Sequence, residues 1–155
     1  MDFQQIQVEI RGAVGILSLN APDKLNALTP LMVSEISTAI DHIAQQCRVM
    51  IITGAGRAFC SGASLDPKNP LSPVDQDPSA RDLGLLLEQQ LNPIMLTRKN
   101  LDKPWISALR GATAGFGDAL GLAAAMDLAS ATASLAQMYS TIGHAPAGRR
   151  QLTPP

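Results

Sequence analysis

The sequence is poor in aromatic residues, cysteine and charge, and each shortage excludes a class of protein. Aromatic residues make up 3% of the 155 residues, so the core must be built from Leu, Ile, Val, Met and Ala. Two cysteines, Cys47 and Cys60, are too few for a disulfide framework and do not form a Cys-x-x-Cys motif. We therefore expect reduced thiols and a cytoplasmic protein. The two histidines, His42 and His144, have no second ligand at metal-binding spacing, so no metal site is predicted.

Charge is also scarce, at 16% of the residues with a formal net charge of −1. Such a balance gives no general attraction to nucleic acid or to an anionic membrane surface. The N-terminus has no basic stretch followed by an apolar one, so no secretory signal is predicted. The longest stretch of low charge, 111–135, contains Asp118 and Asp127 and is a poor membrane span. With 46% hydrophobic residues, the length predicts one globular domain.

Hydrophobic periodicity predicts alternating strands and helices. Residues 7–11 and 14–19, on either side of Gly12, have the pattern of a β-hairpin. A helix over 30–46 is expected after Thr29, which can cap its N-terminus while proline occupies its first position. The following segments are read as a buried parallel strand at 49–53, a loop at 66–80, a helix at 80–101 broken near Pro93, a strand at 103–109 and a small-residue helix at 117–126. This order predicts an α/β fold.

Two glycine-containing turns, 54–65 and 111–120, each follow an apolar strand. A turn that opens a helix presents unpaired backbone N–H groups, which can bind a phosphate or the oxyanion of a polarised carbonyl. The run 115–117, Gly-Phe-Gly, suits this role because glycine lets a ligand approach the backbone closely. The glycines agree equally well with tight packing of a strand against a helix, so both interpretations stay open.

Neither turn predicts a nucleotide cofactor. Gly54-Ala55-Gly56 follows a strand as a Rossmann fingerprint does, but Phe59 stands where that fingerprint needs glycine or alanine. The glycine spacing over 111–117 resembles the turn of short-chain dehydrogenases, which also use a Tyr-x-x-x-Lys pair. Here Tyr139 is followed four residues later by Gly143.

Four stretches, in order and together covering about 8–146, resemble the crotonase (enoyl-CoA hydratase/isomerase) superfamily. They are LNAPDKLNAL at 19–28, MIITGAGRAFCSGASL at 50–65, KPWISALRGATAGFG at 103–117 and MYSTIG at 138–143. The segments 82–85 and 91–93 look most like the ring-epoxide isomerase of phenylacetate catabolism.

The resemblance implies an α/β, crotonase-like ββα spiral core that binds an acyl-CoA thioester. Coenzyme A is then part of the substrate, and no separate cofactor is expected. The family holds the thioester oxygen, as it becomes an enolate, with two backbone N–H groups, which fall on Ala63 and Phe116. Full-length relatives are expected to be trimer-based homo-oligomers. The positions that correspond to the substrate-binding segments are Lys24, Leu25, Ala27, Ser61, Ser64, Leu65 and Gly115.

The departures from the family pattern affect proton transfer. Ala119 and Tyr139 stand where hydratases carry glutamates, and Ala147 stands where other members use an aspartate. Asp118 is adjacent to the first position, but one helical step turns a side chain by about 100°. Ser64 and Arg110 also replace residues that are commonly Asp and Asn.

Two hypotheses remain open for the function. The first is an enoyl-CoA hydratase or isomerase with its oxyanion hole intact. The second is a non-catalytic acyl-CoA-binding remnant or a fragment. We expect residues 1–146 to form a partial crotonase-like core and 147–155 an off-pattern tail. The chain stops where family members continue into a helical region, which predicts a truncated or frameshifted member.

Overall fold

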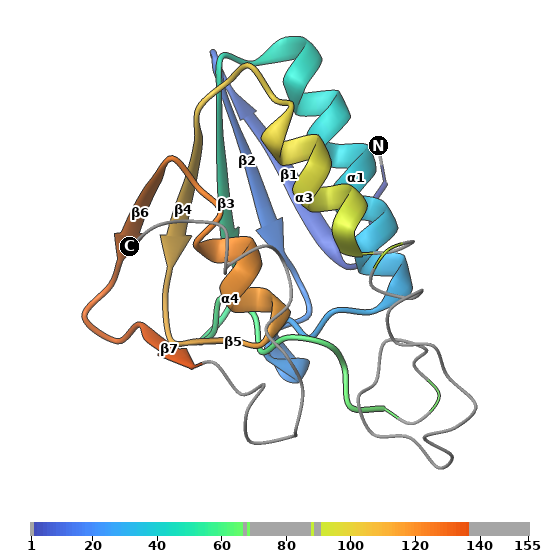
Figure 1. Ribbon diagram of the computed structural model, residues 1–155, viewed down its shortest axis with the longest axis vertical. Coiled ribbons are helices and arrows are strands. Elements are labelled where there is room, and N and C mark those ends of the chain that lie inside the picture. The colour runs from blue at the N-terminus through green and yellow to red at the C-terminus, as the bar shows by residue number, and fades with distance from the viewer. Residues whose placement is uncertain (1, 67, 69–87, 89–90, 137–155) are drawn as a thin grey trace.

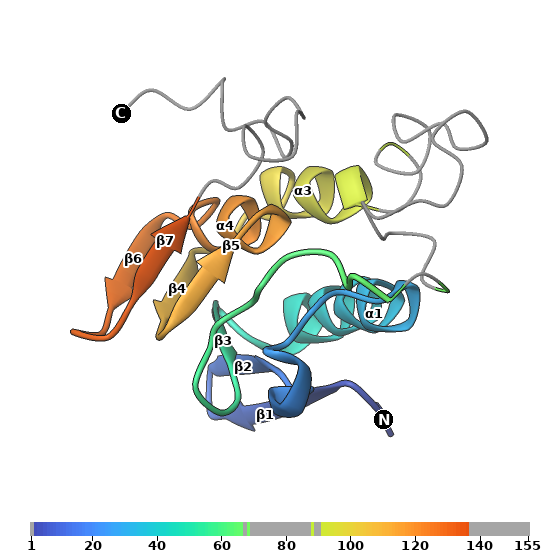
Figure 2. The same cartoon turned by 90° about the horizontal axis from the view of Figure 1, so that it is seen from below.

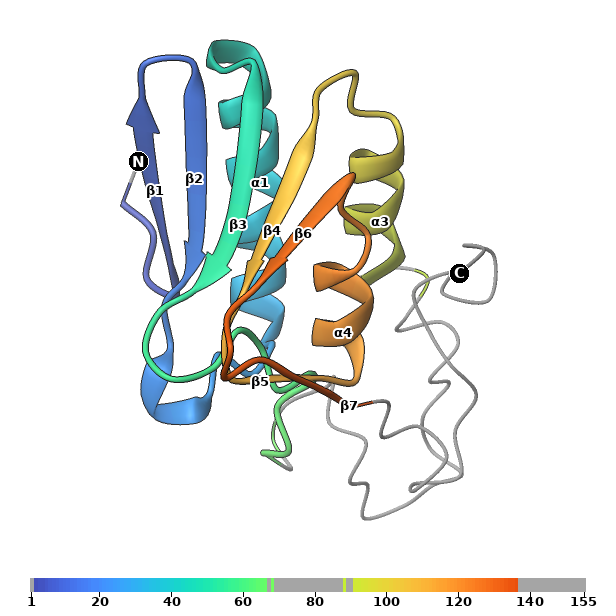
Figure 3. The same cartoon turned by 90° about the vertical axis from the view of Figure 1, so that its left-hand side faces the viewer.

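The computed structural model describes residues 2–66, 68, 88 and 91–136. A five-stranded sheet carries helices on one face, as Figure 1 shows from the helical side and Figure 3 from the strand side. Its strands, in spatial order, are β1 (Ile6–Arg11), β2 (Val14–Leu19), β3 (Val49–Gly54), β4 (Trp105–Leu109) and β6 (Met126–Ala129). β1 is antiparallel to β2, and the other neighbouring pairs are parallel.

The remaining elements of the described residues are three helices, one short 3-10 turn and a second small sheet. These are η1 (Pro22–Lys24), α1 (Pro30–Gln46), α3 (Asn92–Lys99), α4 (Phe116–Gly121), and the parallel strands β5 (Ala112–Ala114) and β7 (Ser134–Ala136). The described helices include none with the length and apolar content needed to cross a membrane.

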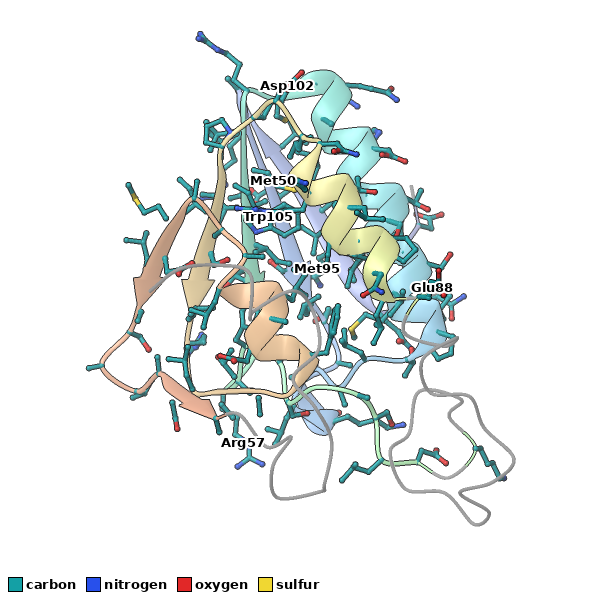
Figure 4. The ribbon with its side chains drawn as sticks, viewed as in Figure 1. Met50, Arg57, Glu88, Met95, Asp102 and Trp105 are labelled. Carbon is teal, nitrogen blue, oxygen red and sulfur yellow. The ribbon has the colours of Figure 1, made fainter. Side chains whose placement is uncertain are left out.

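The core lies between the sheet and the helices. α1 buries an apolar stripe against β1 and β2, and it contacts α3 along its side. Figure 4 shows Met50 and Trp105 of the sheet beneath α3, which contributes Met95 to the same layer. The core residues with the largest fully buried side chains are Trp105, Phe59, Ile6, Leu17, Leu19, Leu28, Met32, Ile36, Ile40, Ile43, Met50 and Ile52.

The first half of the chain confirms the sequence predictions closely. The hairpin forms between β1 and β2, and β3 is a parallel strand as predicted. It is not buried throughout as expected, because only alternate residues face the core. α1 covers the expected 30–46, with the Thr29 hydroxyl accepting a hydrogen bond from the Met32 N–H at 3.1 Å and proline in the first turn. Local signals suffice here because capping chemistry and apolar spacing agree with the tertiary packing.

Two helix predictions differ from the structure or extend beyond it. The predicted helix 80–101 lies outside the described residues over 80–87 and 89–90; its described part contains α3, which begins at Asn92 with Pro93 in the first turn and ends at Lys99. The predicted helix 117–126 is wrong in its second half, because α4 ends at Gly121 and Met126 starts β6. Pairing of β6 with β4 outweighs the helix propensity of the three alanines at 123–125, which lie between α4 and β6. The predicted loop 66–80 lies outside the described residues except at 66 and 68.

The sheet face away from the helices is only half covered. One row across it consists of Ile16, Ile51, Ile106 and Met126, which are paired in register from strand to strand. The three isoleucines are half-buried, whereas Met126 and Leu128 on the edge strand β6 are each 57% exposed. On this face the exposed large apolar side chains therefore lie on β6, whereas all six residues of α4 are buried.

Candidate active site

Two glycine turns are in backbone contact at one end of the sheet. Gly62 and Gly115 both have positive backbone φ angles, +94° and +56°, which residues other than glycine rarely adopt. A Cβ atom on Gly62 would lie 2.9 Å from the Ala114 carbonyl oxygen and 3.5 Å from the Gly115 Cα. Because Ala63 follows the first glycine and Phe116 follows the second, the two predicted oxyanion-binding residues come from adjoining turns.

Backbone hydrogen bonds fix one turn against the other. The N–H groups of Phe59 and Cys60 donate to the Ala112 carbonyl at 3.1 and 3.2 Å. The Ala114 N–H donates back to the Cys60 carbonyl at 2.9 Å. Gly117 permits this approach, since a Cβ there would lie 2.5 Å from the Cys60 oxygen. The spacing between the turns is thus set by the main chain.

The N–H of Ala63 points away from its neighbouring segment. The Leu28 N–H donates to the Gly62 carbonyl at 2.7 Å, and the Ser64 N–H donates to the Leu28 carbonyl at 3.0 Å. This is a parallel bridge in which the groups on both sides of Ala63 bond to Leu28. The alternation of a strand therefore directs the N–H of Ala63 to the opposite side.

Neither predicted donor is used within the described chain. Among the residues that the structure describes, none accepts a hydrogen bond from the N–H of Ala63 or of Phe116. Phe116 is the first residue of α4, where a helix has no internal acceptor for an N–H group. Both donors therefore keep their hydrogen-bonding capacity for another acceptor.

The loop 21–28 lies against the first glycine turn. The Ser61 N–H donates to the Leu25 carbonyl at 3.0 Å, which places Lys24, Leu25 and Ala27 beside the segment that leads to Ala63. Figure 2 shows η1 and the loop after β3 side by side at this end of the sheet. The predicted site residues on these two segments range from buried to exposed: Ser64 is 7% exposed, Leu65 is 64% exposed and Lys24 is exposed. The structure thus brings all nine predicted site residues onto three contacting segments: Ala63, Phe116, Lys24, Leu25, Ala27, Ser61, Ser64, Leu65 and Gly115.

Sequence reasoning missed Asn26, which joins this loop to the turn after β3. Its side chain is fully buried, and its backbone is left-handed with φ +54°. The amide oxygen accepts from the Ala21 N–H, and the amide nitrogen donates to the carbonyls of Ala55, Ala58 and Phe59. Asparagine tolerates the left-handed region better than most residues. An asparagine shortly after a turn that begins with proline was therefore the available sequence signal for Asn26.

Comparison with known proteins agrees with this geometry. Residues 9–154 match the family model described as enoyl-CoA hydratase/isomerase. The chain is 31% identical over 148 residues to a probable enoyl-CoA hydratase of Rhodobacter capsulatus, and 32% identical over 148 residues to the 1,2-epoxyphenylacetyl-CoA isomerase of Escherichia coli. Each alignment covers 94% of this chain and 54% of the relative.

The chain belongs to the enoyl-CoA hydratase/isomerase family. A crystal structure of an enoyl-CoA hydratase subunit from Geobacillus kaustophilus superposes with a TM-score of 0.80 at 30% identity, covering 99% of this chain and 57% of the other. The predicted α/β, crotonase-type fold is therefore confirmed, as is the resemblance to the ring-epoxide isomerase, which is among these relatives. The chain spans about half the length of the curated relatives it matches.

A buried methyl group lies at position 119, where the resemblance predicts a glutamate in hydratases. Ala119 is 5% exposed and lies three residues after Phe116, hence on the same side of α4 and one turn further along. Asp118 is 1% exposed but is turned by about 100° from Ala119. Tyr139 and Ala147, the other two predicted departures at acid–base positions, lie outside the described residues. Within the described ranges, no group of three His, Cys, Asp or Glu side chains could hold a metal ion.

Cys60, in the first turn, is expected to be chemically inert in the folded protein. Burial raises the pKa of its thiol from 9.0 to about 12, because the thiolate would lose its hydration. We expect a thiol reagent at pH 8 to modify Cys60 only at the rate of unfolding. Since the unfolded thiol ionises near pH 9 and the folded one near pH 12, folding stability should fall as the pH rises through this interval.

The measurement is urea unfolding at several pH values between 8 and 11, for the wild type and for Cys60→Ala. The difference in unfolding free energy between the two proteins isolates Cys60, because all other groups titrate in both. A difference that stays constant with pH, or rapid labelling of Cys60 in the native state, would contradict the predicted pKa.

Proposed function

We propose that this chain binds an acyl-CoA thioester and holds its carbonyl oxygen between the backbone N–H groups of Ala63 and Phe116. The observation that carries the proposal is the pair of contacting glycine turns, each followed by an N–H group without an acceptor in the described chain. Two fixed donors stabilise the negative charge that develops on a carbonyl oxygen when the neighbouring carbon loses a proton. Family membership supports the choice of thioester over other carbonyl compounds.

The remaining predicted residues would bind the coenzyme A portion. They lie on the two segments next to Ala63 and include exposed side chains, such as Lys24 and Leu65, that an extended ligand can reach. Six residues are proposed for this role: Lys24, Leu25, Ala27, Ser61, Ser64 and Leu65. Gly115, in the second glycine turn, is proposed as a further substrate-binding residue. No separate cofactor enters the proposal.

Binding and polarisation are the functions that these residues support best, and hydration or isomerisation is the second candidate. Family membership favours the second candidate, because relatives 31% and 32% identical to this chain carry hydratase and isomerase names. Ala119 counts against it, because a methyl group cannot transfer a proton. The N–H pair alone can favour an enolate but cannot deliver or remove a proton.

Acetoacetyl-CoA provides the test, because its enolate absorbs ultraviolet light differently from its keto form. Wild-type protein should bind it with measurable heat and increase its enolate absorption. Phe116→Pro removes one donor at a helix position that accepts proline, and Phe116→Ala is the matched control that loses the same ring but keeps the N–H. We expect Phe116→Pro to lose about ten- to a hundredfold more affinity for the enolate than Phe116→Ala, a difference of about 1.4–2.8 kcal/mol.

Ala63→Pro and Ala63→Gly form the corresponding pair in the first turn. The Ala63 N–H takes part in none of the backbone hydrogen bonds of the described chain, so its removal breaks none of them. Absence of binding heat with folded wild-type protein would refute the proposal. Equal enolate absorption from both members of each pair would show that these N–H groups do not contact the carbonyl oxygen.

A further inference from the structure

Asn26 meets the requirements for a residue that sets the position of the Ala63 N–H. Its side chain is 0% exposed, and the four hydrogen bonds that it makes in the described chain all go to the main chain. The Ala21 N–H donates to its oxygen at 2.9 Å. Its nitrogen donates to the carbonyls of Ala55 and Ala58 at 2.9 Å each and to that of Phe59 at 3.2 Å.

These contacts connect both segments that hold Ala63. The carbonyls of Ala58 and Phe59 belong to the chain that enters the first glycine turn, four to five residues before Ala63. Leu28, two residues after Asn26, forms backbone hydrogen bonds with the residues on both sides of Ala63, Gly62 and Ser64. The segment before Ala63 and the segment beside it are therefore tied together at one buried amide.

We infer that Asn26 is a positioning residue for the oxyanion-binding N–H of Ala63, an inference that rests on the proposed function. Without the amide, three carbonyl oxygens lose a donor, and loop 21–28 loses the side-chain hydrogen bonds through which Asn26 joins it to the turn after β3. The bridge between Leu28 and Ala63 then has freedom to shift. The direction of the Ala63 N–H would change while the coenzyme A contacts on exposed residues remain.

Asparagine suits this position for two physical reasons. A single amide supplies both an acceptor for the Ala21 N–H and two N–H donors for the facing carbonyls. Its backbone φ of +54° is tolerated by asparagine, aspartate and glycine better than by other residues. Asn26→Gly therefore keeps the backbone and removes the side chain, whereas Asn26→Asp keeps the shape and places a carboxylate against three carbonyl oxygens.

The experiment compares two ligands, acetoacetyl-CoA and free coenzyme A, on the wild type, Asn26→Gly, Asn26→Asp and Ile36→Val. Ile36→Val is the control for stability alone, because Ile36 is a fully buried core residue of α1. At saturating acetoacetyl-CoA, we expect the enolate absorption per bound ligand to fall about tenfold in both Asn26 variants. The Kd for free coenzyme A should change less than about threefold, and Ile36→Val should keep both values.

A residue with only a structural role would lower thermal stability and affect both ligands alike. The inference is overturned if a folded Asn26 variant keeps the wild-type enolate absorption at saturation, or if neither Asn26 variant folds. If the wild type itself gives no enolate absorption, the proposed function fails first. That result is distinguishable because it appears before any variant is compared.

Discussion

Hydration of crotonyl-CoA by this chain is expected to be slower by about 10²–10⁴-fold, for each absent acid–base group, than hydration by a relative that carries both glutamates. The N–H groups of Ala63 and Phe116 can stabilise the enolate, but hydration also needs a base to activate water and an acid to protonate carbon. Ala119 offers neither, because its side chain is a methyl group, 5% exposed.

A glutamate at position 119 should restore part of the activity. Ala119 lies one turn after Phe116, and helical side chains tilt toward the N-terminus of the helix, so a longer side chain would extend toward the proposed oxyanion position. We expect Ala119→Glu to raise the hydration rate by about tenfold or more over Ala119→Gln, which has the same shape and no acid–base chemistry. The rate is measured as loss of the enoyl absorption, with folding of each variant checked by circular dichroism.

Two outcomes would contradict this expectation. A wild-type rate close to that of two-glutamate relatives would show that another side chain already transfers the proton. Equal rates for the glutamate and glutamine variants would show that position 119 does not face the reacting carbon.

The sequence predicts those parts of the fold that depend on local chemistry. Thr29, Pro30 and the apolar spacing after them predict α1 completely, since the cap and the stripe act within one helix. The end of α4 and the strands β5, β6 and β7 are different, because they are short and are defined by pairing with distant segments. Periodicity over three or four residues carries too little information for such strands.

The site shows the same division. The potential of each glycine turn to present N–H groups follows from the sequence, but the contact between Gly62 and Gly115 depends on how β3 and β4 pair. The roles of Ala63 and Phe116 came from family resemblance, because a backbone donor leaves no trace in side-chain identity. Asn26 was missed because its three carbonyl acceptors lie about 30 residues away in the sequence.

Gly111→Ala is expected to produce the largest loss of stability among single-methyl additions near the site. A Cβ atom on Gly111 would lie 1.8 Å from the Arg57 carbonyl oxygen and 2.9 Å from its carbonyl carbon. Arg57, which Figure 4 places at the end of the molecule near β5 and β7, belongs to the loop that leads into the first glycine turn. The methyl group can be accommodated only if this loop separates from the strand that leads to the second turn.

Gly12→Ala is the matched control for backbone strain. Gly12 has φ +58°, against +55° for Gly111, and a Cβ atom on Gly12 would have no atom within 4 Å. Both substitutions carry the left-handed penalty of about 1–2 kcal/mol, so the difference between them measures the close approach of the two loops. We expect urea unfolding to show a loss of about 1–2 kcal/mol for Gly12→Ala and about 2–3 kcal/mol more for Gly111→Ala.

The two variants should also differ in the binding of acetoacetyl-CoA. Gly12 lies in the β1–β2 hairpin turn, so its variant should keep the wild-type enolate absorption. In Gly111→Ala, the N–H groups of Ala63 and Phe116 move apart with their loops, and a single oxygen can no longer accept from both. Comparable stability losses for the two variants would mean that the loop containing Arg57 can move away from the added methyl group at little cost in free energy. In that case main-chain packing at Gly111 would not set the distance between the two N–H donors.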